Sequence, residues 1–223
     1  MRIELTGAGK RFNREWIFRN FSFVFEAGRV YAITGPNGSG KSTLLQVIGG
    51  QLQVSEGKIH YENNEKTIDP EKAFQHLSFA APYLEVIEEM TLLEFLDFHI
   101  RFKPLRPGYL PTDLVRIAGL EAAAGKQIRY YSSGMKQRVR LMQAFFSDTA
   151  VLLLDEPCSN LDKQGIGLYR QLIDEHHDDR LVIISSNDPV EYESSDTVIN
   201  ITDYKSGYRP LAVEENKDLY TKK

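Results

Sequence analysis

The stretch from Gly35 to Thr43, Gly-Pro-Asn-Gly-Ser-Gly-Lys-Ser-Thr, constrains the fold and chemistry of this 223-residue chain most strongly. It fits the phosphate-binding pattern G-x-x-x-x-G-K-[ST], in which glycines let successive backbone N–H groups surround an anion. Residues 29–34 predict a buried strand before it, and residues 42–48 predict a helix that stops at a glycine pair. The helix N-terminus adds its partial positive charge. We therefore expect the chain to bind a nucleoside triphosphate.

The side chains of this loop have distinct expected roles. Lys41 would reach the β- and γ-phosphates, the Ser42 hydroxyl would bind Mg²⁺, and Thr43 would donate to the α-phosphate. A glycine-rich turn without a ligand is the alternative, but such a turn has no need for Lys and Ser after its last glycine. The expected nucleotide-binding residues of the loop are Gly35, Asn37, Gly38, Ser39, Gly40, Lys41, Ser42 and Thr43.

Residues 151–157 form a second informative run, an apolar strand that ends in Asp155 and Glu156. A phosphate-loop protein needs a carboxylate at the end of a neighbouring strand to hold Mg²⁺, and Asp155 fits this role. Glu156 is then placed to orient or deprotonate the water that attacks the γ-phosphate. The alternative is that the two acids only cap the following loop. A complete phosphate loop nearby makes the catalytic interpretation the stronger one.

Composition narrows the class of partners. The chain is 42% hydrophobic and 26% charged, with a net charge of −4, which is typical of a globular protein and weakly disfavours nucleic acid. No apolar segment approaches the ~20 residues that cross a bilayer, and the N-terminus alternates like a strand rather than a signal peptide. One cysteine, Cys158, cannot form an internal disulfide, which suits a reducing cytosol.

The spacing of apolar residues predicts the organisation of the chain. Alternation in residues 3–5 and 21–25 predicts half-buried antiparallel strands, and residues 57–61 predict another strand of the same sheet. Short apolar runs that alternate with helical patterns predict a parallel sheet with helices on both faces. The expected strands of this second sheet are residues 29–34, 77–80, 151–154, 181–185 and 197–201, with helices at 135–146 and 163–175.

Residues from about 83 to 131 predict a helical insertion between two strands of the main sheet. Thr91 with Glu94 makes a capping-box pattern before an apolar stripe that runs from Leu92 to Phe102, which we expect to be core. A second short helix is expected from Thr112 to Ala118. The charged tail, residues 214–223, is expected to fray.

Residues 131–135, Tyr-Ser-Ser-Gly-Met, open a predicted helix ahead of the acidic strand. Alone they predict only a serine N-cap. At this spacing they resemble the Leu-Ser-Gly-Gly-Gln signature of the ATP-binding-cassette (ABC) ATPases, with the key serine, Ser132, and the second glycine, Gly134, retained. The resemblance covers nearly the whole chain, because residues 159–162 and the helical insertion also match the family pattern.

The resemblance implies an α/β fold: one nucleotide-binding domain, residues 1–223, with a RecA-like parallel sheet of the P-loop NTPase kind. An N-terminal antiparallel β subdomain and a helical subdomain, about residues 83–131, would complete it. Ser132, Ser133 and Gly134 would face the γ-phosphate of ATP held by a second subunit, so hydrolysis would need a dimer. Phe12 would stack on adenine, with a core phenylalanine as the alternative.

The resemblance also implies a function and partners. The chain would be a Mg²⁺-dependent ATPase subunit that powers a membrane ABC transporter from the cytoplasmic face of the membrane. Its partners would be transmembrane permease subunits, contacted through the surface around residues 83–89, and another cassette, in a homodimer or heterodimer. Nucleic acid is not an expected partner. In this family the membrane subunits select the transported substrate.

Two positions depart from the family pattern. The family usually has a glutamine, which contacts Mg²⁺ and the attacking water, where Pro82 stands here, and Glu85, Glu88 or Glu89 are candidate substitutes. The family also has a histidine where Asn187 stands; an asparagine amide donates a hydrogen bond but carries no charge, which weakens transition-state stabilisation. With Glu156, Lys41 and Asn187 as catalytic residues, we expect slow but real hydrolysis.

Two other functions are weighed against this one. An ATP-binding switch with little turnover, in a heterodimer or outside transport, is favoured by the missing glutamine and histidine and opposed by Glu156. A phosphate-loop kinase of small molecules would need neither the serine-glycine helix start nor residues 159–162.

Overall fold

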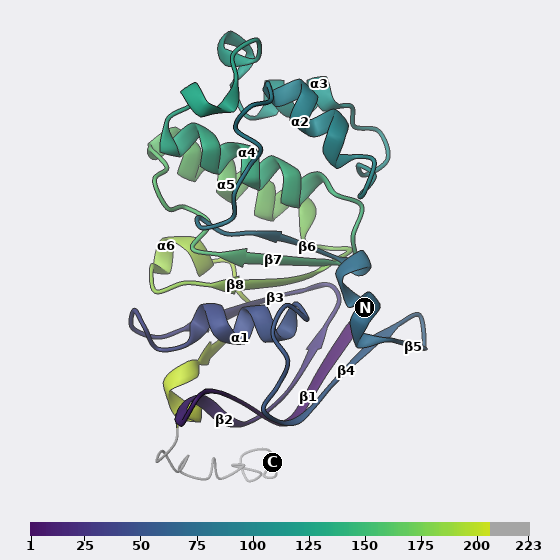
Figure 1. Cartoon of the computed structure of the whole chain (residues 1–223), viewed down its shortest axis with the longest axis vertical. Coiled ribbons are helices and arrows are strands. Elements are labelled where there is room, and N and C mark those ends of the chain that lie inside the picture. The colour runs from purple at the N-terminus through teal and green to yellow at the C-terminus, as the bar shows by residue number, and fades with distance from the viewer. Residues whose placement is uncertain (206–223) are drawn as a thin grey trace, which may run out of the picture.

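The computed structural model describes residues 1–205, which form two β-sheets with helices packed against them (Figure 1). The predicted fraying tail, residues 214–223, lies outside the described residues. The fold class predicted from the sequence, an α/β phosphate-loop fold with an antiparallel β part, is confirmed. No helix of residues 1–205 has the length and apolarity needed to cross a bilayer.

The larger sheet is parallel, and its strands alternate between two apolar layers. Odd-numbered side chains such as Leu153 and Ile183 pack toward α1, and even-numbered ones such as Leu154 and Ile184 pack toward α4 and α5. The five strands occur in the order β6-β7-β8-β3-β9, and the helices lie on both faces (Figure 1). Their bounds are β3 Arg29–Thr34, β6 Leu77–Ala80, β7 Val151–Asp155, β8 Leu181–Ser185, β9 Thr197–Asn200, α1 Lys41–Ile48, α4 Ser133–Phe146, α5 Lys163–His176 and α6 Pro189–Tyr192.

The smaller sheet is antiparallel, with the order β2-β1-β4-β5, and it covers α1 from the side opposite the parallel sheet. Its strands are β1 Arg2–Phe12, β2 Glu15–Glu26, β4 Glu56–Asn63 and β5 Lys66–Ile68. The sequence did not predict β5. Asn64 and Glu65 both have positive φ, 49° and 60°, so they form a tight hairpin turn that returns the chain along β4.

The segment between β6 and α4 contains two short helices, α2 Leu92–His99 and α3 Pro111–Ile117, and 3₁₀ turns at residues 121–123 and 128–130. Thr91 caps α2 through the predicted capping box with Glu94. The expectation that Phe102 belongs to the core is wrong. Because α2 ends at His99, Phe102 lies beyond the helix, where 71% of it is exposed and its ring packs edge-on against Phe98 at 5.0 Å.

A buried arginine, Arg180, closes the end of the sheet where α4 finishes and β8 begins. It is 1% exposed, and its guanidinium donates to the carbonyls of Phe145 at 2.7 Å, Thr149 at 3.1 Å and Ser147. These carbonyls belong to the end of α4 and the loop before β7, where no helical N–H remains to satisfy them. Arg180 therefore holds the strand that carries the acidic pair.

We predict that Arg180→Met lowers the free energy of unfolding by about 2–4 kcal/mol, because the buried carbonyls of Phe145 and Thr149 lose this donor and that of Ser147 keeps only the Thr149 N–H. Urea unfolding monitored by circular dichroism measures the change. Arg116→Met is the matched control, since Arg116 is exposed and forms an ion pair with Asp113 on the surface. Equal losses in the two variants would contradict this account of Arg180.

Candidate functional site

The phosphate loop connects β3 to α1 and closes around a cavity of about 220 Å³. Gly40 is the N-cap residue of α1, with a φ of 106°, and a side chain there would approach Ile17 of β2 to 2.4 Å, so the position requires glycine. The cavity is lined by Ile17, Asn37, Gly38, Ser39, Gly40, Lys41, Ser42, Thr43 and Glu156. Most of the predicted loop residues therefore face one hollow at the N-terminus of a helix.

Lys41, the charged residue of the loop, is 5% exposed and bonded within the loop itself. Its Nζ donates to the carbonyl oxygens of Gly35 at 2.9 Å and Pro36 at 3.3 Å. Both bonds fold the ammonium group back over the loop. Lys41 also lines the cavity, so its ammonium group is placed to bind an anion there.

The acidic pair lies at the carboxyl end of β7, beside this cavity. Asp155 is 1% exposed, and neither of its carboxylate oxygens has a hydrogen-bond partner among residues 1–205. A buried carboxylate without a partner is costly unless a cation binds it. Oxygen ligands suit Mg²⁺, so Asp155 and the Ser42 hydroxyl fit the predicted metal site.

Glu156 directly follows β7 and lines the phosphate cavity. Its φ is 43°, a left-handed backbone that is uncommon for a side chain of this size. The strain is held by neighbours: the Glu156 N–H donates to the Ser185 carbonyl at 2.8 Å, and Gln137 Nε2 donates to the Pro157 carbonyl at 2.9 Å. The backbone conformation thus fixes Glu156 at the cavity rather than in the strand.

Asn187 lies in the loop after β8, and it reaches the phosphate loop across the end of the sheet. Its Nδ2 donates to the Asn37 side-chain oxygen at 3.0 Å. The structure thus brings Asn187 together with the phosphate loop.

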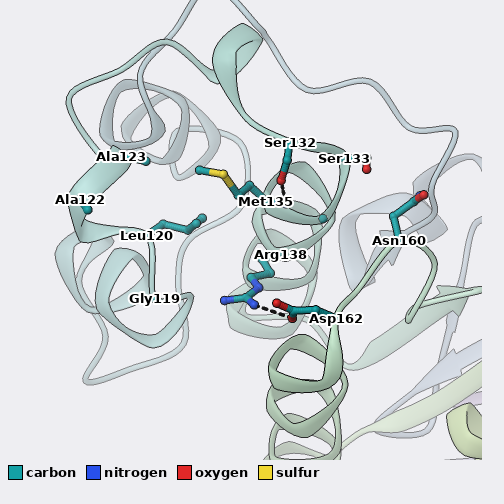
Figure 2. A pocket seen from close by; sticks show the side chains of 11 residues that line it. Gly119, Leu120, Ala122, Ala123, Ser132, Ser133, Met135, Arg138, Asn160 and Asp162 are labelled. Carbon is teal, nitrogen blue, oxygen red and sulfur yellow. Dashed lines mark hydrogen bonds and ion pairs between the residues drawn. The ribbon is translucent and has the colours of Figure 1, made fainter.

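The signature-like residues belong to a second, separate cavity of about 390 Å³ at the N-terminus of α4 (Figure 2). Ser132 caps α4 by accepting the Met135 N–H at 3.2 Å, and Arg138 pairs with Asp162 at 2.8 Å across the cavity wall. A side chain at Gly134 would lie 2.7 Å from the Asn160 carbonyl oxygen, so this contact requires glycine. The residues that line this second cavity are Gly119, Leu120, Ala122, Ala123, Ser132, Ser133, Gly134, Met135, Arg138, Asn160 and Asp162.

The two cavities share no lining residue. The predicted site residues therefore form two groups on one chain: the phosphate loop with Glu156, Asp155 and Asn187, and the α4 N-terminus with Ser132 to Gly134.

Phe12 lies at the end of β1 and is 47% exposed, with the Lys10 ammonium 5.2 Å from its ring centre. The alternative that Phe12 is a core phenylalanine is wrong. β1, which carries this ring, belongs to the same antiparallel sheet as β2, and Ile17 of β2 lines the phosphate cavity.

The glutamates considered as substitutes for the missing glutamine turn to other partners. Glu88 pairs with Lys136 at 2.5 Å and Glu89 with Arg129 at 3.1 Å, while Glu85 is exposed. Instead, the Tyr83 hydroxyl accepts a hydrogen bond from Gln46 Nε2 of α1 at 3.1 Å. Tyr83 and Gln46 carry no pattern in the sequence that marks them as site residues.

A second unpredicted residue, Glu191 of α6, supports the segment that follows the acidic pair. It is 6% exposed and accepts the Cys158 N–H at 2.6 Å, and its own carbonyl accepts the Tyr169 hydroxyl at 2.6 Å. Burial raises the pKa of Glu191 to about 7, with smaller contributions from nearby Asp188 and Glu156. Glu191 therefore links the loop that carries Asn187 to the loop that carries Glu156.

Comparison with known proteins agrees with this geometry. Residues 18–159 match the family described as "ABC transporter". The chain is 32% identical over 154 residues to the cytochrome c biogenesis ATP-binding export protein CcmA of Xylella fastidiosa, covering 69% of this chain and 71% of that protein. It is 31% identical over 192 residues to the uncharacterized ABC transporter ATP-binding protein YybJ of Bacillus subtilis, covering 83% and 85%.

Among solved structures, the ATP-binding cassette MJ0796 in a dimeric, post-hydrolysis state bound to ADP and Pi superposes with a TM-score of 0.75. The identity is 22%, with 94% of this chain and 97% of that chain covered, so this likeness shows the fold. Together, the fold, the phosphate loop, the signature-like start of α4 and these matches place the chain in the class of phosphate-loop ATPase cassettes. This chain belongs to the ABC transporter ATP-binding family.

The pKa of Glu191 leads to a pH prediction. Its folded pKa of about 7 lies above the usual ~4.3 for an unfolded glutamate, so between these values the folded state binds more protons. The contribution of Glu191 to stability is then complete below about pH 4 and is lost as the pH rises through 7. Glu191→Gln should therefore be more stable relative to the parent protein at pH 8 than at pH 5, by urea midpoint. Glu193→Gln, with an exposed carboxylate on the same turn, controls for loss of one charge; equal pH dependence in both variants would contradict the assignment.

Proposed function

We propose that this chain is the ATP-hydrolysing subunit of a membrane transporter, and that it works as a pair of cassettes closing on two ATP molecules. One observation carries the proposal: the chain has two separate cavities, each at a helix N-terminus, one at the phosphate loop before α1 and one at the start of α4. Neither cavity combines a phosphate loop with a signature-like helix start. A second copy, or a related cassette, would supply the missing half to each ATP.

The relatives support this proposal. CcmA of Xylella fastidiosa is named an ATP-binding export protein, and the MJ0796 cassette is described as a dimer bound to ADP and Pi. By the same logic, one ATP would lie between the Gly35–Thr43 loop of one cassette and Ser132, Ser133 and Gly134 of the other. Phe12, with its exposed ring, would stack on adenine.

The residues at the phosphate cavity support a division of labour in hydrolysis. Mg²⁺, bound by Ser42 and Asp155, would neutralise charge on the phosphates. Lys41 would hold the β- and γ-phosphates, and Glu156 would orient the attacking water and accept its proton. Asn187 would donate a hydrogen bond to the γ-phosphate from the position at which it now contacts Asn37.

Turnover is proposed to be slow, because Asn187 contributes a neutral donor where the family has a histidine. The same observation supports a second candidate, an ATP-binding switch that changes conformation with little hydrolysis. Glu156, which lines the phosphate cavity, favours the hydrolytic function.

The proposed partners are transmembrane permease subunits at the cytoplasmic face of a membrane, with a homodimer or heterodimer of cassettes. The net charge of −4 weakly disfavours nucleic acid as a partner. Co-purification with a membrane subunit distinguishes the transporter from a soluble switch.

Phosphate release from MgATP, measured across a series of protein concentrations, tests the function. We predict a rate per subunit that rises with concentration, because each ATP needs two chains. Glu156→Gln should retain ATP binding and lose at least ~99% of phosphate release, since an amide cannot accept the proton. Glu85→Gln is the matched control, because Glu85 is exposed outside the cavity.

The outcomes separate the candidates. A rate that rises with concentration and disappears in Glu156→Gln supports hydrolysis by a pair of chains. A rate equal to that of Glu156→Gln at every concentration, with ATP still bound, would support the switch instead. Unchanged release in Glu156→Gln would remove Glu156 from the role of base.

A further inference from the structure

The connector that leaves β6 passes directly beside the acidic pair. β6 pairs in parallel with β7, with Ala80 opposite Leu154, so the chain leaves β6 at the sheet edge where Asp155 ends β7. Three residues beyond Ala80, the Tyr83 side chain reaches across to α1, where its hydroxyl accepts a hydrogen bond from Gln46 Nε2 at 3.1 Å. Tyr83 therefore connects the end of β6, which lies beside the Asp155 strand β7, with α1, which carries Ser42.

The position of Gln46 identifies the side of α1 that Tyr83 contacts. Gln46 follows Ser42 by four residues, so the two side chains lie on the same face of the helix, one turn apart. Ser42 is the proposed metal ligand of this helix. The Tyr83 hydroxyl is thus held on the metal-binding face of α1.

The hydrogen bond with Gln46 does not use the phenol proton of Tyr83, which therefore remains available to donate. A phenol oxygen both donates and accepts, and here it accepts from the Gln46 amide. The Asp155 carboxylate lies close enough to this hydroxyl to influence it, and neither oxygen of Asp155 has a hydrogen-bond partner among residues 1–205.

The backbone that carries Tyr83 is anchored to the signature-like helix. Arg140 Nε of α4 donates to the Leu84 carbonyl at 2.6 Å, and Arg140 Nη1 donates to Gln137 Oε1 at 3.3 Å. Gln137 in turn donates to the Pro157 carbonyl, next to Glu156. These contacts hold the connector against α4, so that the hydroxyl is pre-positioned.

We propose that Tyr83 is a positioning residue of the nucleotide site, whose hydroxyl donates to Asp155 when Mg²⁺ and nucleotide are bound and so orders the metal ligands. Ligating carboxylates in proteins are themselves hydrogen-bonded, and their outer partners determine how tightly the metal is held. Tyr83 is the hydroxyl-bearing residue that the connector after β6 brings to this side of the site. The expectation that Glu85, Glu88 or Glu89 fills this side is replaced by Tyr83. This inference rests on the proposed function, because it assumes Mg²⁺ at Asp155.

The test compares Tyr83→Phe with Tyr130→Phe, both made in the Glu156→Gln chain so that ATP persists. Tyr130 is 72% exposed in the helical segment, so its variant controls for loss of one phenol hydroxyl. A fluorescent ATP analogue is titrated first in EDTA and then at increasing Mg²⁺. We expect both variants to bind the analogue equally well in EDTA, and Tyr83→Phe alone to need ~10–100-fold more Mg²⁺ for half-saturation.

A third variant, Gln46→Leu, should shift the Mg²⁺ midpoint in the same direction by a smaller factor, because it frees the hydroxyl without deleting it. Equal Mg²⁺ midpoints for Tyr83→Phe and Tyr130→Phe would overturn the inference about Tyr83. A loss of analogue binding by Tyr83→Phe in EDTA that is as large as its loss in Mg²⁺ would also overturn the inference, because it would show a purely structural role. Failure of the proposed function is seen separately, as absence of phosphate release from the unmodified chain when its Mg²⁺ titration is normal.

Discussion

The parallel pairing of β3, β6, β7 and β8 is the constraint on which the candidate site depends. In this register the carboxyl ends of all four strands meet at one sheet edge, with Asp155 beside Ser185 and Ile33 beside Ser185 from the other side. The phosphate loop, the acidic pair, Asn187 and the Tyr83 connector all begin where one of these strands ends. Ligand sites of open α/β sheets form at this edge, because loops from separate strands converge there.

Much of this arrangement is predictable from the sequence, because it rests on local patterns. The glycine loop, the apolar run before Asp155 and the capping box at Thr91 are each encoded within a few residues. Strand periodicity then predicts which elements are buried, and short connections with parallel strands determine how they can pair. These rules were sufficient for the parallel sheet, for β1, β2 and β4 of the antiparallel sheet, and for most helix bounds.

The remaining features depend on contacts between residues far apart in the chain. Tyr83 meets Gln46, and Glu191 meets Cys158, through irregular connectors whose direction no periodicity encodes. Phe102 was misplaced for a related reason: the apolar stripe continues past His99, but the helix does not, so the ring turns to solvent. A local pattern predicts an element better than it predicts the side chains beyond its end.

The central claim is that each ATP is completed by two chains, because the phosphate loop and the signature-like helix start line separate cavities. Sedimentation velocity of the Glu156→Gln chain, run without nucleotide, with MgADP and with MgATP, tests it most directly. The account predicts a monomer in the first two conditions and a dimer with MgATP, and a monomer in all three when Ser132→Arg is added. A monomer with bound MgATP, or a dimer that ignores nucleotide, would contradict it.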